Sequence, residues 1–290
     1  MAGKKSLLKK IIKLITPYGF LLLYKKIKLY KIINIPKKIN PLKISSKESP
    51  QFIVTLTSHG RRVKQTAPYA VYSLLNQTVQ PDKIVLWLAN ETKIPRKLQK
   101  LQKMGLEIKF CEDIRSYKKL VPALHEFPDD VLITADDDFY YASNWLELLK
   151  DAYLQDPTKI YCYRAREICL DENKNIIPYM EWRCNIKTIE YSKRIFPTGV
   201  GGILYPPHSF NDEIFDKSKY QTLAPTADDI WFWAMARHNG KEYGLIRNNF
   251  NGSIEMEINE DELFSINIIK NDEQIKNVIN EYPDVYKSIL

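Results

Sequence analysis

The chain has 290 residues, of which 44% are hydrophobic and 12% aromatic. This content is typical of a globular protein with a sizeable core and excludes a wholly disordered chain. The formal charge of +8 comes from one segment, because residues 1–43 hold 12 lysines and no acidic residue. The remainder has 31 basic residues against 35 acidic ones, a net charge of −4, which argues against a nucleic-acid partner.

The four cysteines form no CxxC pair and have no recognisable metal-ligand spacing. Free, reduced cysteines are the simplest interpretation, and they are typical of a cytosolic protein. We therefore expect a cytoplasmic location, where the sequons at Asn90 and Asn251 are not glycosylated.

Residues 1–50 predict a basic amphipathic arm followed by a linker. Between residues 5 and 15 the apolar residues recur at helical spacing, with lysines largely on the other side. The longest uncharged run, Leu14–Tyr24, has 11 residues and is too short to span a bilayer. We expect the arm to lie on an anionic membrane surface, the inner face of the plasma membrane. A helix packed on the body with solvated lysines is the alternative.

From residue 51 the pattern predicts alternating strands and helices. The expected strands are Phe52–Ser58, Lys83–Ala89, Leu106–Glu112 and Asp130–Asp138. The expected helices are Ala67–Asn76, Pro95–Met104, Ser116–Phe127 and Trp145–Leu154. This alternation indicates an α/β fold with a mostly parallel sheet flanked by helices. Ligands of such sheets collect beyond the carboxyl ends of the strands.

Three consecutive aspartates, Asp136–Asp138, end the fourth expected strand. Their carboxylates repel one another, so a positive charge is expected beside them. In an extended strand Asp136 and Asp138 project to one side and Asp137 to the other. Mg²⁺ or Mn²⁺ takes one or two carboxylates and completes its shell with phosphate and water. The alternative is an acidic turn that caps the next helix, although Ser143 or Asn144 could cap it instead.

Two later motifs accompany the aspartates. The run "PTGVGGILYPP" has glycines at 199, 201 and 202, which allow a close approach of the backbone to a ligand or a tight strand crossing. The run "APTADDIWFWAMARHNG" predicts a helix start, with Thr226 as a possible N-cap and Asp228 and Asp229 in the first turn. The helix dipole alone would favour acids there. A carboxylate held at that point could instead act as a general base.

Together, "ADDDFYY", "FPTGVGGILYPP" and "PTADDIWFWAMARHNG" resemble the bacterial glycosyltransferases of GT-A fold found in capsule and lipopolysaccharide gene clusters. The resemblance covers roughly residues 52–249. It implies a Rossmann-like fold and metal-dependent transfer of a sugar from a nucleotide-sugar donor, with a bias toward UDP, to a glycan or lipid-linked acceptor. It also implies a nucleotide-sugar half at 51–141, an acceptor half at 142–250 and a C-terminal extension at 251–290.

The resemblance further implies roles for single residues. It makes Asp136 and Asp138 the DxD pair that binds Mn²⁺ or Mg²⁺, with Asp136 also leaning toward the donor. It makes Asp229 the base of an inverting reaction, with Asp228 binding acceptor hydroxyls. The other implied donor-binding residues are Thr55, Ser58, Arg61, Asp113 and Lys119, with Lys118 as the alternative to Lys119. The implied acceptor-binding residues are Gly201, Gly202 and Trp231. One departure from the family pattern is that no histidine occupies an obvious C-terminal metal-ligand motif.

Three other functions remain to be weighed. A retaining transferase of the same fold has the same motifs. A non-catalytic membrane-associated scaffold would have no reason to keep both acidic motifs. A dehalogenase-type phosphotransferase fits poorly, because "DDDFY" lacks the required threonine and follows about 130 residues of chain.

Overall fold

The computed structural model describes residues 24, 27, 30, 41–42, 50–90, 92–184, 186, 192–246, 253–256 and 262–290, with the backbone alone for 262–269. The expected amphipathic arm and its linker therefore lie mostly outside the described residues. Within the described part of the chain, no helix combines the length and the apolar character that a bilayer crossing requires.

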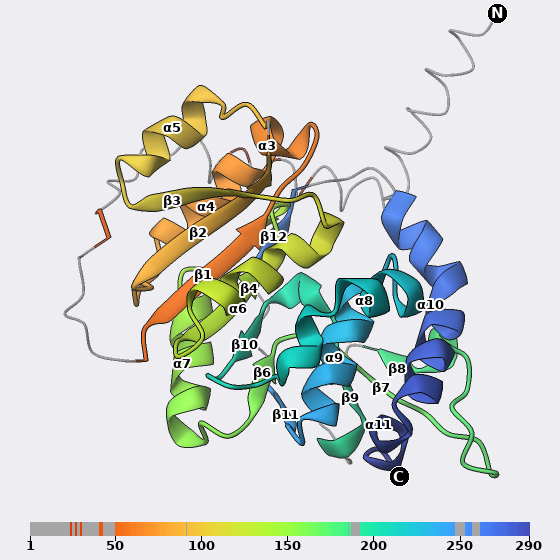
Figure 1. Ribbon diagram of the computed structural model, residues 1–290. Helices are drawn as coiled ribbons and strands as arrows, with labels where there is room; N and C mark the ends of the chain where they lie inside the picture. The colour runs from red at the N-terminus through yellow and green to blue at the C-terminus, as the bar shows by residue number, and fades with distance from the viewer. Residues whose placement is uncertain are drawn as a thin grey trace, which may run out of the picture.

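A seven-stranded sheet organises the body in the order β11-β6-β10-β4-β1-β2-β3 (Figure 1). All neighbouring strands pair in parallel except β10, which runs antiparallel to both β4 and β6. Its strands are β1 Phe52–Thr57, β2 Lys83–Ala89, β3 Leu106–Cys111, β4 Val131–Ala135, β6 Ile160–Cys162, β10 Ile203–Tyr205 and β11 Tyr243–Leu245. The predicted α/β class with a mostly parallel sheet is confirmed.

Smaller sheets and helices complete the described fold. The remaining strands are β5 Phe139–Tyr140, β7 Ala165–Glu167, β8 Arg183–Cys184, β9 Ile195–Pro197 and β12 Ile254–Glu255. The α-helices are α3 Arg62–Gln65, α4 Ala67–Leu75, α5 Arg96–Gln102, α6 Val121–Glu126, α7 Trp145–Gln155, α8 Lys217–Leu223, α9 Asp228–His238, α10 Glu262–Glu281 and α11 Pro283–Lys287. The 3₁₀ turns are η1 Arg115–Lys119, η2 Tyr179–Glu181, η3 Ser192–Arg194, η4 Gly199–Gly201 and η5 Asp212–Phe215.

Both faces of the sheet are buried. Successive side chains of a strand point to opposite faces, so neighbouring residues enter different core clusters. In β1, Ile53 belongs to the core cluster that includes residues of α6, α9 and α11. The next residue, Val54, belongs to the cluster that includes residues of α4, α5 and α7. Figure 1 shows α6 crossing in front of the sheet. Helices on both faces explain why the strands have long apolar runs, as the sequence predicted.

The structure corrects several local expectations. The single helix expected at Ser116–Phe127 is divided into η1 and α6, because Pro122 fits only in the first turn of a helix and α6 begins just before it. The N-cap of α9 is Ala227, so the assignment of Thr226 was wrong. Thr226 instead donates its backbone N–H to Gln274 at 3.0 Å. The C-terminal segment, expected only as an extension, contains a 20-residue helix, α10.

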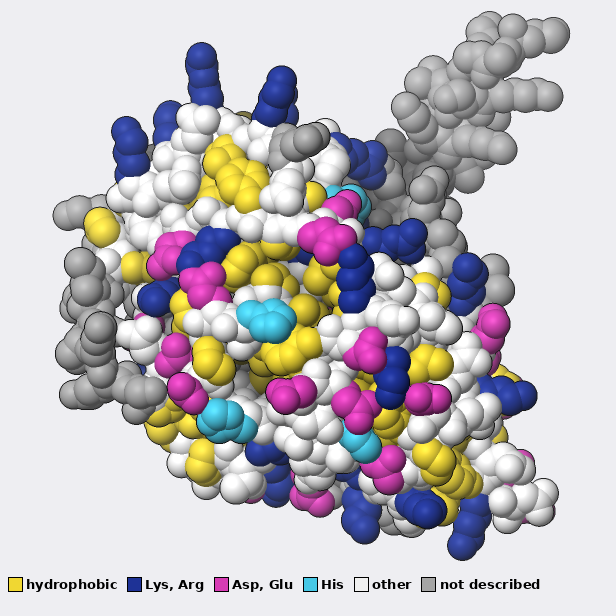
Figure 2. Space-filling view, in the orientation of Figure 1, with side chains coloured by type: hydrophobic (Ala, Val, Ile, Leu, Met, Phe, Trp, Pro, Cys, Tyr) yellow, Lys and Arg dark blue, Asp and Glu magenta, His cyan; other side chains and the backbone are white. Residues whose placement is uncertain are grey.

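Charged side chains of both signs are interspersed over the face shown in Figure 2. Lysines and arginines project at the top of that view, and acids and histidines lie over its middle and lower parts together with further basic residues. This mixture agrees with the small net charge of the body that the sequence indicated.

The glycine turn before β10 generates a stability prediction. Gly202 has φ +94° and ψ 141°, and a Cβ there would lie 2.5 Å from the ring of buried Trp145. Gly202→Ala should therefore cost about 2–5 kcal/mol, through backbone strain and the clash together. Gly240→Ala is the matched control, since Gly240 has φ +72° and open space around it. It should cost about 1–2 kcal/mol. Equal losses in urea denaturation of the two variants would contradict the clash.

Candidate functional site

The acidic turn after β4 lies beside the end of β1. The two strands pair in parallel, with Leu56 opposite Ala135, so the residues that follow each strand meet at the same sheet edge. There the Ser58 hydroxyl donates a 2.5 Å hydrogen bond to Oδ2 of Asp137, and both side chains are buried. Ser58 thus holds the middle aspartate, as the register of the two strands requires.

Arg62, the first residue of α3, supplies a positive charge to this turn. Its Nη1 lies 3.4 Å from Oδ1 of Asp137 and 3.2 Å from Oδ2 of Asp138. Asp137 and Asp138 therefore share a partner, which corrects the expectation that Asp136 and Asp138 lie together opposite Asp137. The reason is that the chain leaves the extended conformation after Ala135 and turns at Asp137 and Asp138.

The backbone of the same turn is fixed from two directions. The N–H of Asp136 donates to the Tyr141 hydroxyl at 2.7 Å. The carbonyl of Asp138 accepts from the Met256 N–H at 2.8 Å, where β12 pairs antiparallel with β5. A C-terminal strand more than a hundred residues away in the chain thus closes one side of the acidic turn.

Lys119 lies between the two acidic segments. Its carbonyl accepts a 2.7 Å hydrogen bond from the hydroxyl of Thr55 on β1, and that hydroxyl accepts from the indole of Trp87 at 3.0 Å. The ammonium of Lys119 lies 3.3 Å from Oδ1 of Asp136 and 3.1 Å from Oδ2 of Asp228. One lysine therefore joins the end of β4 to the start of α9.

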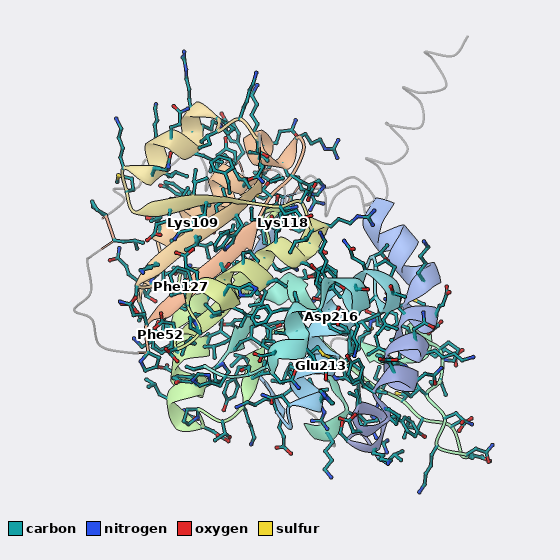
Figure 3. The ribbon with its side chains drawn as sticks, in the orientation of Figure 1. Phe52, Lys109, Lys118, Phe127, Glu213 and Asp216 are labelled. Carbon is teal, nitrogen blue, oxygen red and sulfur yellow. The ribbon has the colours of Figure 1, made fainter. Side chains whose placement is uncertain are left out.

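The neighbouring Lys118, labelled in Figure 3, has a different partner. It is 2% exposed, and its ammonium forms an ion pair with Asp113 at the end of β3. The hydrogen bond from Lys118 lowers the pKa of Asp113. The sequence left Lys118 and Lys119 as alternatives, and the structure puts Lys119 beside Asp136 and Lys118 beside Asp113.

Burial by itself would lower the pKa of the Lys119 ammonium. The carboxylates of Asp136, Asp228 and Asp229 outweigh that effect and raise this pKa well above its ordinary value. Lys119 is therefore charged near neutral pH, where it serves as a cation beside these carboxylates.

The glycine turn brings Asp229 to the same place. Because β10 runs antiparallel to β4, with Ile203 opposite Thr134, the turn before β10 lies next to the end of β4. There the Gly199 N–H donates to Oδ2 of Asp229 at 3.0 Å. A Cβ on Gly199 would lie 2.8 Å from Oδ1 of Asp229 and 3.0 Å from the ammonium of Lys119. Any larger residue at this position would displace one of these two charged groups.

Asp229 differs electrostatically from an ordinary aspartate. Burial and the neighbouring carboxylate of Asp228 raise its pKa from 3.8 to about 7, against the opposing effects of Lys119 and the Gly199 N–H. A carboxyl group with such a pKa can take up or release a proton near neutral pH, which is the property required of a general base.

The donor set suits a divalent cation of the Mg²⁺ or Mn²⁺ type. Five carboxylates, those of residues 136–138 and 228–229, gather here, and four of them form ion pairs with Arg62 or Lys119. Their oxygen donors are the kind that these metals prefer. The described residues contain no group of three or more His, Cys, Asp or Glu side chains that could hold a metal. A cation there would need water or phosphate to complete its shell.

The other residues implicated by the sequence lie in different surroundings. Thr55 is fully buried beneath Lys119, and Arg61 is exposed at the N-cap of α3. Gly201 and Gly202 pack against Tyr163 and Trp145, the indole of Trp145 donating to the Gly201 carbonyl at 2.8 Å. Trp231 is fully buried, and its indole donates to the Ile214 carbonyl at 3.2 Å. The structure thus brings Ser58, Lys119 and the acidic residues together but leaves Trp231 in the core.

Sequence reasoning missed two members of the cluster, Arg62 and Gly199. Gly199 lies within the quoted glycine motif, so the motif itself was the available signal. Arg62 follows Arg61 in "HGRR", and only the first of these two arginines was assigned a role. No local pattern distinguishes the arginine that turns toward the aspartates from the one that faces solvent.

No protein-family model and no curated protein matches the chain. Among solved structures, that of CMP:2-keto-3-deoxy-manno-octonic acid synthetase complexed with CTP is similar, with a TM-score of 0.43 and 12% identity over 70% of this chain and 90% of that chain. A crystal structure of 4-diphosphocytidyl-2C-methyl-D-erythritol synthase has a TM-score of 0.48 and 9% identity over 76% of this chain and 100% of that chain. At such identities neither similarity carries a function to this chain.

The raised pKa of Asp229 predicts a pH-dependent stability. Between pH 3.8 and about 7 the folded state holds a proton that the unfolded state has lost, so Asp229 destabilises the folded protein as the pH rises through this window. Asp229→Asn removes this penalty. The melting temperature of the variant relative to the wild type should rise from pH 4 to 7 and level off above. The free energy of unfolding should gain about 2–4 kcal/mol in total over this range. Asp151→Asn, on the exposed side of α7, should show no such slope. A flat difference for Asp229→Asn would contradict the shift.

Proposed function

We propose that this chain is a glycosyltransferase that moves a sugar from a nucleotide-sugar donor to a glycan or lipid-linked acceptor in the synthesis of cell-surface polysaccharide. The observation that carries this proposal is the convergence of two acidic segments, 136–138 and 228–229, on Lys119 at the carboxyl end of the sheet. Sugar transfer requires a site for a departing diphosphate and a base for an incoming hydroxyl, and the two segments supply a candidate for each.

The donor side of the site is proposed at the end of β4. Asp136 and Asp138 would hold Mn²⁺ or Mg²⁺ together with the diphosphate of a nucleotide sugar, UDP being favoured. The cation would supply Lewis-acid stabilisation of the charge that develops on the departing diphosphate. Arg62 and Lys119, which already pair with these aspartates, are close enough to contribute their positive charges to the same diphosphate. Ser58, Arg61, Thr55 and Asp113 would border the nucleotide or support its pocket.

The acceptor side is proposed at the start of α9. Asp229 would accept the proton of the acceptor hydroxyl, and its pKa of about 7 suits that task near neutral pH. The Gly199 N–H holds one oxygen of this carboxyl, which leaves the other to face the hydroxyl. Asp228 would bind a second acceptor hydroxyl. Gly201, Gly202 and Trp231 would shape this side from behind. An Asp base implies inversion, and the anomeric configuration of the product distinguishes it from the retaining alternative.

The domain division and the arm belong to the same proposal. Residues 51–141 would form the nucleotide-sugar half, 142–250 the acceptor half and 251–290 an extension packed beside α9. Residues 1–50 would hold the enzyme at the inner face of the plasma membrane, close to a lipid-linked acceptor. Free cysteines, as found here for all four, agree with a cytoplasmic enzyme.

Two variants should separate the proposed sides of the site. Asp138→Asn should weaken Mn²⁺-dependent binding of UDP at least tenfold, because one of the two proposed metal ligands is lost. Asp229→Asn should leave that binding within about twofold and lower turnover by about 10²–10⁴, because the base is lost. Binding is measured by calorimetry, and turnover by release of nucleotide from a panel of nucleotide sugars with Mn²⁺.

Asp151→Asn, exposed on α7, is the control for both measurements and should behave as the wild type. Wild-type protein that binds no nucleotide with or without Mn²⁺ would favour the scaffold alternative. Release of pyrophosphate from a nucleoside triphosphate, without hydrolysis of any nucleotide sugar, would indicate nucleotidyl transfer and contradict sugar transfer. Near-normal turnover in Asp229→Asn would refute the assignment of the base.

The arm generates a prediction of its own. Deleting residues 1–43 removes 12 lysines and should abolish sedimentation with anionic vesicles, since each lysine near such a surface contributes about 1 kcal/mol. The full chain should bind anionic vesicles and release them as salt is raised. The vesicles to compare are neutral phosphatidylcholine and mixtures with phosphatidylserine. Unchanged binding by the truncated chain would place the membrane contact elsewhere.

A further inference from the structure

We propose that Lys119 is a positioning residue that couples the two acidic segments, holding the start of α9 against the end of β4 and keeping the Asp229 carboxyl available as an anion. The inference rests on the proposed function for its catalytic meaning, since Asp229 is the base only in that proposal. The ion pairs themselves do not depend on it. Their effect on Asp229 can be measured without any substrate.

The first argument is geometric. The ammonium of Lys119 lies 3.3 Å from Oδ1 of Asp136 and 3.1 Å from Oδ2 of Asp228, so it bridges groups that are about ninety residues apart in the chain. The carbonyl of Lys119 accepts a hydrogen bond from the Thr55 hydroxyl, which fixes the backbone of Lys119 against β1. With 12% of the side chain exposed, Lys119 has little freedom to leave this position.

The second argument concerns Asp228. Its Oδ2 is buried and makes no hydrogen bond of acceptable geometry with the described residues, so the ion pair with Lys119 is the compensation that these residues provide. A buried carboxylate oxygen without a nearby cation would be costly. The ion pair with Lys119 therefore compensates the burial of Asp228, and Asp229 is the next residue in the chain.

The third argument concerns the surroundings of Asp229. The charged groups that act on it most strongly are Asp228, Asp136 and Lys119, and Lys119 is the one cation among these three. Four buried tyrosines also interact electrostatically with Asp229, and burial raises the pKa of each hydroxyl, which keeps it neutral: Tyr117, Tyr179, Tyr205 and Tyr243. Loss of the Lys119 ammonium would therefore leave Asp229 facing two carboxylates and neutral hydroxyls.

The glycine turn makes this arrangement specific. A Cβ at position 199 would lie 3.0 Å from the Lys119 ammonium and 2.8 Å from Oδ1 of Asp229, so both charged groups border the turn. Lysine with its compact ammonium fits beside such a turn. Because both groups border the same turn, loss of the Lys119 charge changes the electrostatic surroundings of Asp229.

The test is a set of thermal unfolding curves between pH 4 and 9 on the full chain. The difference in melting temperature between Asp229→Asn and the wild type levels off where Asp229 finishes ionising in the folded state. The same difference is measured between Lys119→Met/Asp229→Asn and Lys119→Met. We expect it to level off at a pH about one unit or more higher, because an opposite charge within a few ångströms favours the ionised carboxyl. Lys119→Arg should restore most of the wild-type position.

Lys118→Met is the matched control, since Lys118 is the preceding residue in the chain, is also largely inaccessible and pairs with Asp113 instead. It should leave the levelling pH unchanged. If Lys119→Met alone does not fold, Lys119→Met/Asp136→Asn removes both charges of this ion pair and so keeps the net charge of the protein. Levelling at the same pH with and without Lys119 would overturn the inference.

This result is independent of the proposed function, because no step uses a nucleotide sugar. A shifted levelling pH in a protein that transfers no sugar would uphold the coupling and reject the enzyme. If the protein is active, the acid limb of kcat/KM should move upward in Lys119→Met by the same amount as the levelling pH. A fall in kcat with the acid limb unmoved would indicate that Lys119 acts on the donor alone.

Discussion

The site depends on one electrostatic constraint, which is that five carboxylates gather at one edge of the sheet and need positive charges such as those of Arg62 and Lys119 beside them. Lys119 supplies a positive charge to both acidic segments, because it pairs with one acid from each. Neither acidic segment could approach the other without a positive charge between them, since bare carboxylates at this distance would repel and resist burial. The position of Lys119 is in turn set by the hydrogen bond from Thr55 in the middle of β1.

The one antiparallel strand of the main sheet has a consequence for the chemistry. Because β10 runs against β4, its preceding turn, rather than its end, lies at the carboxyl edge of the parallel strands. Glycines in that turn allow the backbone to approach Asp229 and Lys119 more closely than any other residue would. The turn, the strand end and the helix start thus form a single arrangement, and a proton-accepting carboxyl is a property of the arrangement rather than of Asp229 alone.

Much of the fold followed from local patterns. β2 occupies the predicted residues, and β1, β3, α4 and α7 end within one residue of the predicted bounds. Where the predictions failed, a longer-range effect was responsible. Thr226 was assigned as a cap from its residue type, but its backbone bonds to Gln274 on α10. The alternation of Asp136, Asp137 and Asp138 was assigned from strand geometry, but the strand had already ended.

The sequence by itself determined the α/β class and the placing of an acidic turn at the carboxyl end of a buried strand, because apolar periodicity and strand direction are local properties. Only the tertiary structure decided that Arg62 meets Asp137 and Asp138, that Lys119 rather than Lys118 lies beside Asp136, and that Trp231 is buried. Those contacts join residues 17 to 109 positions apart in the chain. They depend on strand register and on the packing of helices over the sheet, and no spacing within one segment encodes either.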